Sequence, residues 1–282
     1  MGISRLPDLL VIGTAKSGTT TLYRWLDDQP EITMSGPKEP NFFSRDENYS
    51  RGIDWYSSLF ADIPGDVLAG EASVEYSAAE RSTVAAPRIA ACLPNAKLVC
   101  LLRDPVERAR SHYRHQVQRG REQRCFWDAL SDAASPYVTD SMYDTCLRPF
   151  AETAADRLCV VRFEDVVTEP SLGWAAIVGH LGLAPRPHPT DVYNVTEQKA
   201  QFGGIARRLF DRGLIAPLER LPRPARRALA AMGTRRGGVY QQRLDESKGP
   251  VPAAIADALY TDAAALARRL GRADLTWNSH GG

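Results

Sequence analysis

Two glycines, a lysine and several hydroxyl side chains lie together near the start of the chain, in GTAKSGTTTLYRWL from Gly13 to Leu26. This stretch follows an apolar run, Leu9 to Ile12, and leads into a helical pattern. A loop between a strand and a helix leaves backbone N–H groups free at the helix start, and these groups bind anions together with the helix dipole. Glycine lets such a loop turn tightly and approach its ligand closely. The stretch therefore predicts a phosphate-binding loop.

The lysine of this loop is in the wrong place for an ATP or GTP enzyme. Their loop reads G-x-x-x-x-G-K-[ST], with the lysine directly after the second glycine. Here the glycine spacing matches, but Lys16 lies inside the loop and Thr19 follows Gly18. We expect a loop that binds phosphate in another setting. A turn without function is the alternative, but it gives no reason for the lysine and the hydroxyl groups.

A second group of anion-binding side chains follows another apolar run, in LLRDPVERARSHYRH from Leu101 to His115. Arg103 ends the run, and Ser111 lies about two turns into the next helical pattern. Both can face the carboxyl edge of a parallel sheet, where open α/β folds bind ligands. An arginine fork and a hydroxyl suit a phosphate monoester. The alternative is an ordinary basic helix with ion pairs such as Glu107–Arg110.

These residues need a layered scaffold, and the apolar runs supply one. Short continuous apolar runs indicate strands that are buried on both faces, and strands that alternate with helices indicate an α/β domain with a mainly parallel sheet. Proline suits the first turn of a helix, which places a helix start at Pro105. The predicted strands are 9–13, 67–72, 97–103 and 158–163, and the predicted helical segments are 22–26, 105–117, 177–183 and 252–270.

Composition bounds the class of protein. The chain has 282 residues, of which 44% are hydrophobic and 24% charged, and its net charge is +1. These values are typical of a globular domain and give no global electrostatic case for binding nucleic acid. No apolar run approaches the ~20 residues of a membrane-spanning helix, and five scattered cysteines favour neither a disulfide framework nor a zinc site. We expect a cytoplasmic protein, and its alanine and arginine content is typical of a high-GC bacterium.

Residues 201–238 differ from the rest of the chain. Nine arginines lie between Arg207 and Arg236, spaced among apolar residues. One interpretation is an amphipathic helical cap with solvated charges. The other is a surface for an acidic substrate or for anionic lipid headgroups at a membrane surface. We therefore expect one domain over 1–282, with 201–245 as an arginine-rich helical cap or substrate-covering segment.

Both phosphate motifs resemble those of sulfotransferases that use 3′-phosphoadenosine 5′-phosphosulfate. Lys16-Ser17-Gly18-Thr19-Thr20 matches the family's K-[ST]-G-T-T loop, and residues 103–113 match its R-[DN]-P-x-x-R-x-x-S-x-Y motif. The segments GPKEPNFFS (36–44), GEASVEYS (70–77) and RFEDVVTEP (162–170) are similar to segments of the heparan-sulfate-type and related bacterial members. The resemblance runs from about residue 7 to about residue 170.

The resemblance implies a P-loop-like three-layer α/β fold and a nucleotide donor. Lys16, Ser17, Gly18, Thr19 and Thr20 would bind the 5′-phosphosulfate, and Arg103 and Ser111 the 3′-phosphate. The product would be adenosine 3′,5′-bisphosphate, and no metal is required. A loop near the C-terminus closes over the nucleotide in this family. Lys248-Gly249 in SKGP is the favoured candidate, and TRRGGV (234–239) is the alternative.

The same resemblance implies three catalytic side chains. Glu71 matches the family's catalytic glutamate and would take the proton of the acceptor. Lys16 and Lys38 would stabilise the transferring group and the leaving oxygen. The small neighbours Gly70 and Ala72 would leave the carboxylate room, although heparan-type enzymes usually have lysine at the position of Ala72.

Other acids and bases lie near these motifs. His112 and His115 are alternative bases, because aryl and steroid sulfotransferases use a histidine. Glu75 is four residues from Glu71, and a solvent-facing role is the expectation for it.

The sequence thus predicts a sulfotransferase that acts on a hydroxyl, less readily an amine, of a carbohydrate, glycolipid or other small molecule. A P-loop kinase and a binding module without catalysis are the alternatives. The acceptor and the oligomeric state are not readable from the sequence.

Overall fold

The computed structural model describes residues 5–36, 38–168, 170–189 and 237–277. Most of the predicted cap, 201–236, lies outside the described residues, so neither interpretation of its arginines is tested. Its last part is helix α13 (Gly237–Glu246). Within the described part of the chain, no helix combines the length and the apolar character that crossing a membrane requires.

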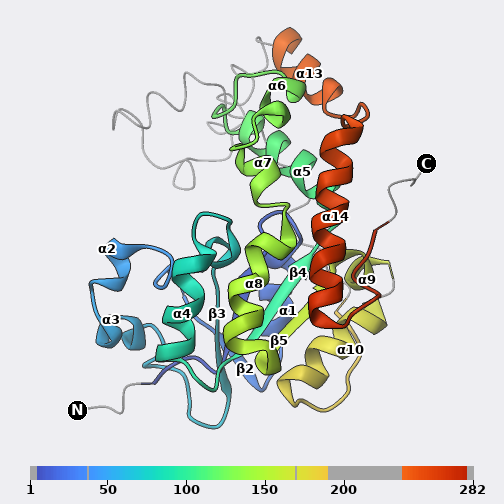
Figure 1. Ribbon diagram of the computed structural model, residues 1–282. Coiled ribbons are helices and arrows are strands. Elements are labelled where there is room, and N and C mark those ends of the chain that lie inside the picture. The colour runs from blue at the N-terminus through green and yellow to red at the C-terminus, as the bar shows by residue number, and fades with distance from the viewer. Residues whose placement is uncertain (1–4, 37, 169, 190–236, 278–282) are drawn as a thin grey trace.

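A five-stranded parallel sheet forms the centre of the domain, in the order β2-β3-β1-β4-β5 (Figure 1). The four predicted strands are confirmed, with ends that differ by at most one residue. A fifth, β2, has three residues and was not predicted. The strands are β1 (Leu9–Gly13), β2 (Ile32–Met34), β3 (Leu68–Ala72), β4 (Lys97–Leu102) and β5 (Leu158–Arg162).

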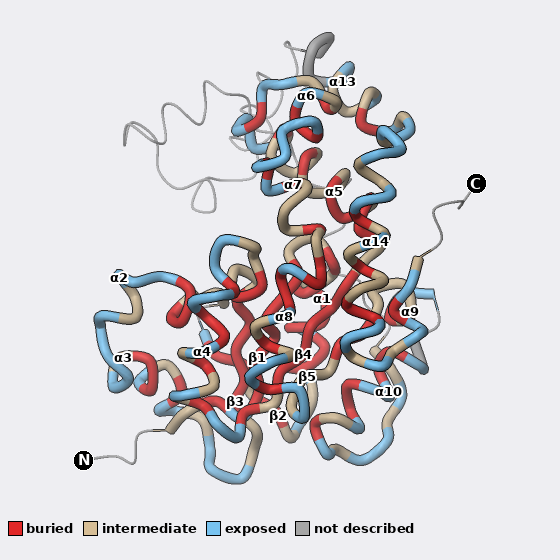
Figure 2. Tube along the Cα trace, viewed as in Figure 1, coloured by how far each residue is buried: buried red, intermediate tan, exposed pale blue. Residues whose placement is uncertain are grey.

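Helices cover both faces of the sheet, which gives the three layers that the sequence predicts. The even-numbered side chains of β1 pack on one face and the odd-numbered ones on the other. Figure 2 shows the buried residues gathered along the strands and on the helix sides that face them. One face is covered by α3 (Ile53–Ser58), α4 (Ser82–Cys92), α8 (Tyr143–Ala154) and α14 (Ala253–Leu270), and the other by α1 (Thr19–Asp27), α9 (Phe163–Val167) and α10 (Pro170–Leu181).

A third apolar cluster lies beyond the sheet. It joins α5 (Pro105–Gln118), α6 (Phe126–Ser131) and α7 (Pro136–Thr139), and Leu244 of α13 packs against it. Helix α5 begins where β4 ends, so this cluster stands at the carboxyl edge of the sheet, with α14 running from it down to the sheet (Figure 1). Three short elements complete the description: α2 (Asp46–Tyr49) and the 3₁₀ turns η1 (Val74–Ser77) and η2 (Ala155–Arg157).

Local sequence explains how α5 starts. Asp104 is the residue before the helix, and its carboxylate accepts a hydrogen bond from the backbone N–H of Glu107 at 2.9 Å. Pro105 follows at the first helical position, where a missing N–H costs nothing. The other carboxylate oxygen of Asp104 accepts from the hydroxyl of Tyr260 on α14 at 3.0 Å. The capping residue therefore also joins α5 to the C-terminal helix.

Candidate active site

The phosphate loop is attached to the neighbouring strand. The backbone N–H and the hydroxyl of Thr14 both donate to the carbonyl of Leu101, at 2.8 and 3.0 Å. The hydroxyl of Ser17 lies 2.7 Å from that of Thr14 and donates to it, since the Thr14 proton is already used. Ser17 is fully buried. Its hydroxyl therefore closes the loop from inside, and donation to a phosphate would require this bond to break.

The loop ends at Gly18, where glycine is needed for two reasons. Its φ is +83°, a conformation that is costly for other residues. A Cβ at this position would also lie 2.6 Å from the ring of Phe163. Helix α1 starts at the next residue, so the amide groups of its first turn lie directly after the loop. Lys16 within the loop also has a positive φ, of 76°.

Phe163 lies against both phosphate motifs. Its ring contacts the backbone at Gly18, and the guanidinium carbon of Arg103 lies 5.4 Å from the centre of the same ring. Arg103 directly follows β4 and retains 27% side-chain exposure. Ser111 lies half-buried on α5. The structure thus brings the phosphate loop and Arg103 to one place at the carboxyl edge. Phe163 was not among the predicted site residues, although its position directly after β5 is a signal that places it there.

The turn at Lys248-Gly249 lies against the helix that carries Arg103's motif. Arg110 donates to the carbonyl of Gly249 at 2.9 Å and also bonds the carbonyl of Ser247. Arg114 donates to the Ser247 hydroxyl at 2.7 Å. The Lys248 ammonium is 66% exposed and pairs with Asp245 at 2.8 Å. Of the alternative segment TRRGGV, residues 234–236 lie outside the described residues.

Glu71 is fully buried in β3. The hydroxyls of Tyr56 and Ser73 donate to its two carboxylate oxygens at 3.1 and 3.2 Å. Burial raises the pKa of this carboxyl from 4.5 to about 7, against the opposing effect of hydrogen bonds from Tyr76, Tyr56 and Ser73. The expectation that Gly70 leaves the carboxylate room is wrong. Side chains alternate along a strand, and the space beside Gly70 is filled by Met34, whose sulfur would lie 2.4 Å from a Cβ there.

Lys38 lies on the loop after β2, and its ammonium pairs with Glu39 at 2.7 Å. The backbone N–H of Glu39 donates to the carbonyl of Ala72 at 3.0 Å, which attaches this loop to the end of the strand that carries Glu71. The charge of Glu39 also acts to raise the pKa of Glu71. Lys38 is 23% exposed. Its ammonium would have to leave Glu39 to reach a sulfuryl group.

His112 is partly buried on α5, with its ring edge-on to that of Tyr137. Burial and the nearby charge of Arg108 lower the pKa of this imidazole to about 2. An N–H of Arg108 lies 3.4 Å from its Nδ1, and the Gln116 amide lies 3.2 Å from its Nε2. A neutral imidazole has one nitrogen that can accept a hydrogen bond, and Arg108 and Gln116 both offer donors to it, which fits a structural role better than that of a base. His115, almost one turn further along α5, is half-buried.

Arg108 is a structural member of the second motif. It is fully buried and donates to the hydroxyl of Ser141 at 2.6 Å and to the carbonyls of Pro136 and Tyr137 at 3.0 and 2.9 Å. These bonds attach helix α7 to α5. The Glu107–Arg110 ion pair that the sequence suggested is present at 2.8 Å.

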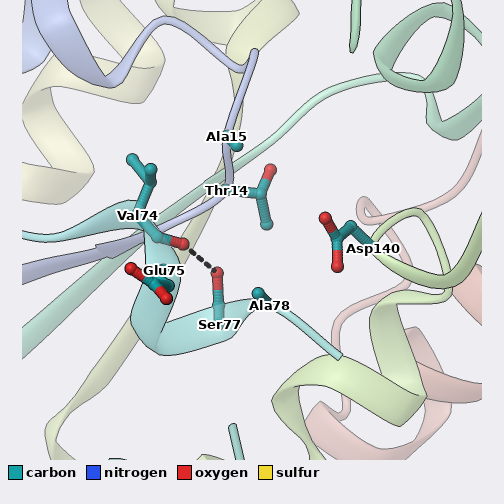
Figure 3. A pocket seen from close by; sticks show the side chains of 7 residues that line it. All are labelled: Thr14, Ala15, Val74, Glu75, Ser77, Ala78 and Asp140. Carbon is teal, nitrogen blue, oxygen red and sulfur yellow. Dashed lines mark hydrogen bonds between the residues drawn. The ribbon is translucent and has the colours of Figure 1, made fainter. Parts of the chain in front are cut away.

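A cavity of about 170 Å³ adjoins the phosphate loop (Figure 3). It lies between the start of the loop, the η1 turn after β3 and the residue that follows α7. Glu75 lines it, keeps 21% side-chain exposure, and pairs with Arg45 at 2.8 Å and with Arg81 at 3.6 Å. The lining residues are Thr14, Ala15, Val74, Glu75, Ser77, Ala78 and Asp140.

Comparison with known proteins identifies the family. The sequence model of the sulfotransferase domain matches residues 6–195, about two thirds of the chain. The chain belongs to the sulfotransferase domain family. A crystal structure of a sulfotransferase from Alicyclobacillus acidocaldarius has the same fold, with a TM-score of 0.59 and 26% identity over 74% of this chain and 92% of that one.

Curated relatives are also sulfotransferases. The bifunctional heparan sulfate N-deacetylase/N-sulfotransferase 2 of Homo sapiens is 31% identical over 202 residues, which are 64% of this chain and 22% of that protein. A membrane-associated sulfotransferase of Dictyostelium discoideum is 41% identical over 116 residues, which are 40% of this chain and 24% of that protein. The chain thus spans less than a quarter of the length of these relatives.

Proposed function

We propose that this sulfotransferase-family protein transfers a sulfuryl group from 3′-phosphoadenosine 5′-phosphosulfate to a hydroxyl, or less readily an amine, of a carbohydrate, glycolipid or other small molecule. One observation carries the proposal. Two phosphate-binding motifs, which are 85 positions apart from Gly18 to Arg103, lie against the same ring of Phe163. Two phosphate-binding motifs beside one ring suit a nucleotide that carries phosphate at two positions.

The residues present fit such a donor. The loop at Gly18 leaves no space for a side chain and precedes the amide groups of α1, which suits a 5′-phosphosulfate. Arg103 is partly exposed at the edge of the sheet, and its nearest carboxylate, Glu107, lies 3.8 Å away. An ion pair of this length is weak, so a phosphate can replace Glu107 as the partner of Arg103. Ser111 lies one turn beyond Glu107 on α5 and would donate its hydroxyl to the same 3′-phosphate.

The donor supplies an activated sulfuryl group, and three side chains of this protein would act on the transfer. Glu71 would take the proton from the acceptor, and its pKa of about 7 suits a base that works near neutral pH. Tyr56 and Ser73 hold its carboxylate in one orientation. Lys16 would stabilise the charge on the leaving phosphate oxygen, and Lys38 the transferring group.

A P-loop kinase is a weaker reading of the same fold. Such an enzyme uses an acidic residue at a strand end to hold magnesium. Asp104 follows β4, but both of its carboxylate oxygens accept hydrogen bonds, from the backbone of Glu107 and from Tyr260. This carboxylate is used to start α5 and to hold α14. A binding module without catalysis would leave the raised pKa of Glu71 without a use.

Calorimetric titration tests the donor. Adenosine 3′,5′-bisphosphate, adenosine 5′-phosphate and ATP are added to the protein without metal. We expect micromolar binding of the bisphosphate and at least about tenfold weaker binding of the other two ligands. A tenfold difference in affinity corresponds to the loss of about one hydrogen bond to a charged group. Preference for ATP, above all with magnesium, would reopen the kinase alternative.

Turnover by Glu71→Gln tests the base. We expect a loss of ~10²–10⁴-fold in the rate of sulfuryl transfer, the usual contribution of a positioned base, with unchanged bisphosphate affinity. Full activity of this variant would show that Glu71 is not the base and would make His115 the next candidate.

A cytoplasmic location and a single domain that includes the 201–245 cap are further parts of the proposal.

A further inference from the structure

The cavity beside the phosphate loop contains a carboxylate with spare hydrogen-bonding capacity. Asp140 follows α7 and points into the cavity, toward Thr14 and Ser77 (Figure 3). Its Oδ1 accepts from the backbone N–H of Ala79 at 3.1 Å. Its Oδ2 has no hydrogen-bond partner among the described residues, and within that same part of the chain no ion pair reaches Asp140. An ionised carboxylate accepts several hydrogen bonds, so Asp140 can take more from a ligand.

The other polar groups of the cavity are already engaged. The Thr14 hydroxyl donates to the Leu101 carbonyl and accepts from Ser17. The Ser77 hydroxyl faces the Val74 carbonyl at 3.5 Å, a long contact. The charge of Glu75 is balanced by Arg45 and Arg81. Asp140 is therefore the charged group of this lining that is left to meet a ligand.

Arg108 holds the residues on both sides of Asp140 in place. The buried guanidinium of Arg108 bonds the carbonyls of Pro136 and Tyr137, before Asp140, and the hydroxyl of Ser141, directly after it. Two of these bonds hold the backbone and the third holds the Ser141 side chain, and none of the three uses the Asp140 carboxylate. Burial raises its pKa, while the nearby charge of Arg108 acts in the opposite direction. A carboxylate half-buried in this way lacks full hydration, and a donor group that enters the cavity would replace it.

The position of the cavity indicates which ligand would enter it. It adjoins Thr14 and Ala15 of the loop that, in the proposed function, holds the 5′-phosphosulfate. With about 170 Å³ it is smaller than the ~300–1,000 Å³ pockets that enclose whole ligands, so it receives one end of a larger molecule. In the proposed function the acceptor must come up to this loop to reach the sulfuryl group, so the acceptor is the ligand that suits this cavity.

We propose that Asp140 binds the acceptor by accepting a hydrogen bond from a hydroxyl or ammonium group next to the phosphate loop. The inference rests on the proposed function and narrows its substrate class. The part of the acceptor near the reacting group is neutral or cationic, such as a polyol, a sugar or an amino sugar. A carboxylate or sulfate at that point is disfavoured, because it would meet Asp140 as a like charge without a donor between them.

Binding of small acceptor fragments tests this without turnover. The protein is saturated with adenosine 3′,5′-bisphosphate, and methyl glucoside, methyl glucosaminide and methyl glucuronide are titrated separately by ligand-observed NMR. We expect the glucoside and glucosaminide to bind at least about tenfold more tightly than the glucuronide. The first two can donate a hydrogen bond to the Asp140 carboxylate, whereas the carboxylate of the glucuronide is repelled by it. In Asp140→Asn, which keeps an oxygen for Ala79, we expect this preference to disappear while bisphosphate affinity is unchanged.

Glu80→Gln is the matched control. Glu80 is exposed, close enough for its charge to affect Asp140, and outside the cavity lining. The Glu80→Gln variant should bind the three sugars with the same order of affinity as the parent protein. Preference for the glucuronide, no binding of any sugar, or the same order in Asp140→Asn would overturn the inference while leaving the donor assignment intact. Failure of the bisphosphate itself to bind would instead overturn the proposed function, and this inference with it.

Discussion

The guanidinium of Arg110 donates a hydrogen bond to the backbone carbonyl of Gly249 at 2.9 Å, across 139 positions of the sequence. The same guanidinium pairs with Glu107 at 2.8 Å, and Glu107 lies 3.8 Å from Arg103. One line of charged groups thus connects the proposed 3′-phosphate site to the C-terminal turn. Only 11% of the Arg110 side chain is exposed, so these contacts are shielded from solvent.

Replacement of Arg110 by alanine should therefore detach this turn. We expect a loss of ~1–3 kcal/mol in the free energy of unfolding, because two backbone carbonyls lose a charged donor. Urea denaturation measures it. Lys248→Ala is the matched control on the same turn: its ammonium is exposed, so stability should not change, whereas bisphosphate affinity should fall if this lysine closes over the nucleotide. Equal stability of the two variants would contradict the role of Arg110 as the anchor.

Arg103→Ala should weaken nucleotide binding selectively. We expect adenosine 3′,5′-bisphosphate to lose ~1.5–3 kcal/mol of binding free energy, the value of a hydrogen bond to a charged group. Adenosine 5′-phosphate, which lacks the 3′-phosphate, should bind as it does to the parent protein. Parallel calorimetric titrations compare the two ligands. Equal losses for both would show that Arg103 does not hold the 3′-phosphate.

Glu71 should make stability depend on pH. Its folded-state pKa of about 7 lies above the ordinary 4.5, so its contribution to stability is fully present below about pH 4.5 and is lost as pH rises through 7. The shift corresponds to about 3 kcal/mol. Because a glutamine side chain cannot ionise, we expect Glu71→Gln to gain stability relative to the parent protein as pH rises from 4.5 to 8. A difference between the two proteins that is constant with pH would argue that Glu71 titrates normally.

Gly18→Ala should destabilise the phosphate loop through backbone and contact together. The positive φ alone costs ~1–2 kcal/mol, and the added methyl group would also displace the ring of Phe163. Gly120→Ala separates the two effects, because Gly120 has a φ of +66° and no atom within 4 Å of the added carbon. Thermal unfolding should show the larger loss for Gly18→Ala. If the losses are the same, the contact with Phe163 does not matter for stability.

Local sequence predicted the parts of the molecule that neighbouring residues decide. The run from Leu9, the two glycines and the following helix depend on contacts within a few positions, and so does the start of α5 at Asp104 and Pro105. Elements whose local signals conflict with their structure were not predicted. Helices α4 and α8 each contain an internal proline, Pro87 and Pro149, which ordinarily argues against a helix. Both are held by packing against the sheet.

The types of the site residues were thus in the sequence, but their states were decided by the tertiary structure. Glu71 is a base candidate by its motif, yet its pKa is raised by burial against the opposing effect of the hydroxyl of Tyr56, which lies on α3. Asp140 had no signal at all, because it meets the phosphate loop only when α7 is attached to Arg108. Spacing along a chain encodes contacts within a turn or a strand. Desolvation, ion pairing and the shape of a cavity depend on which distant segments pack together.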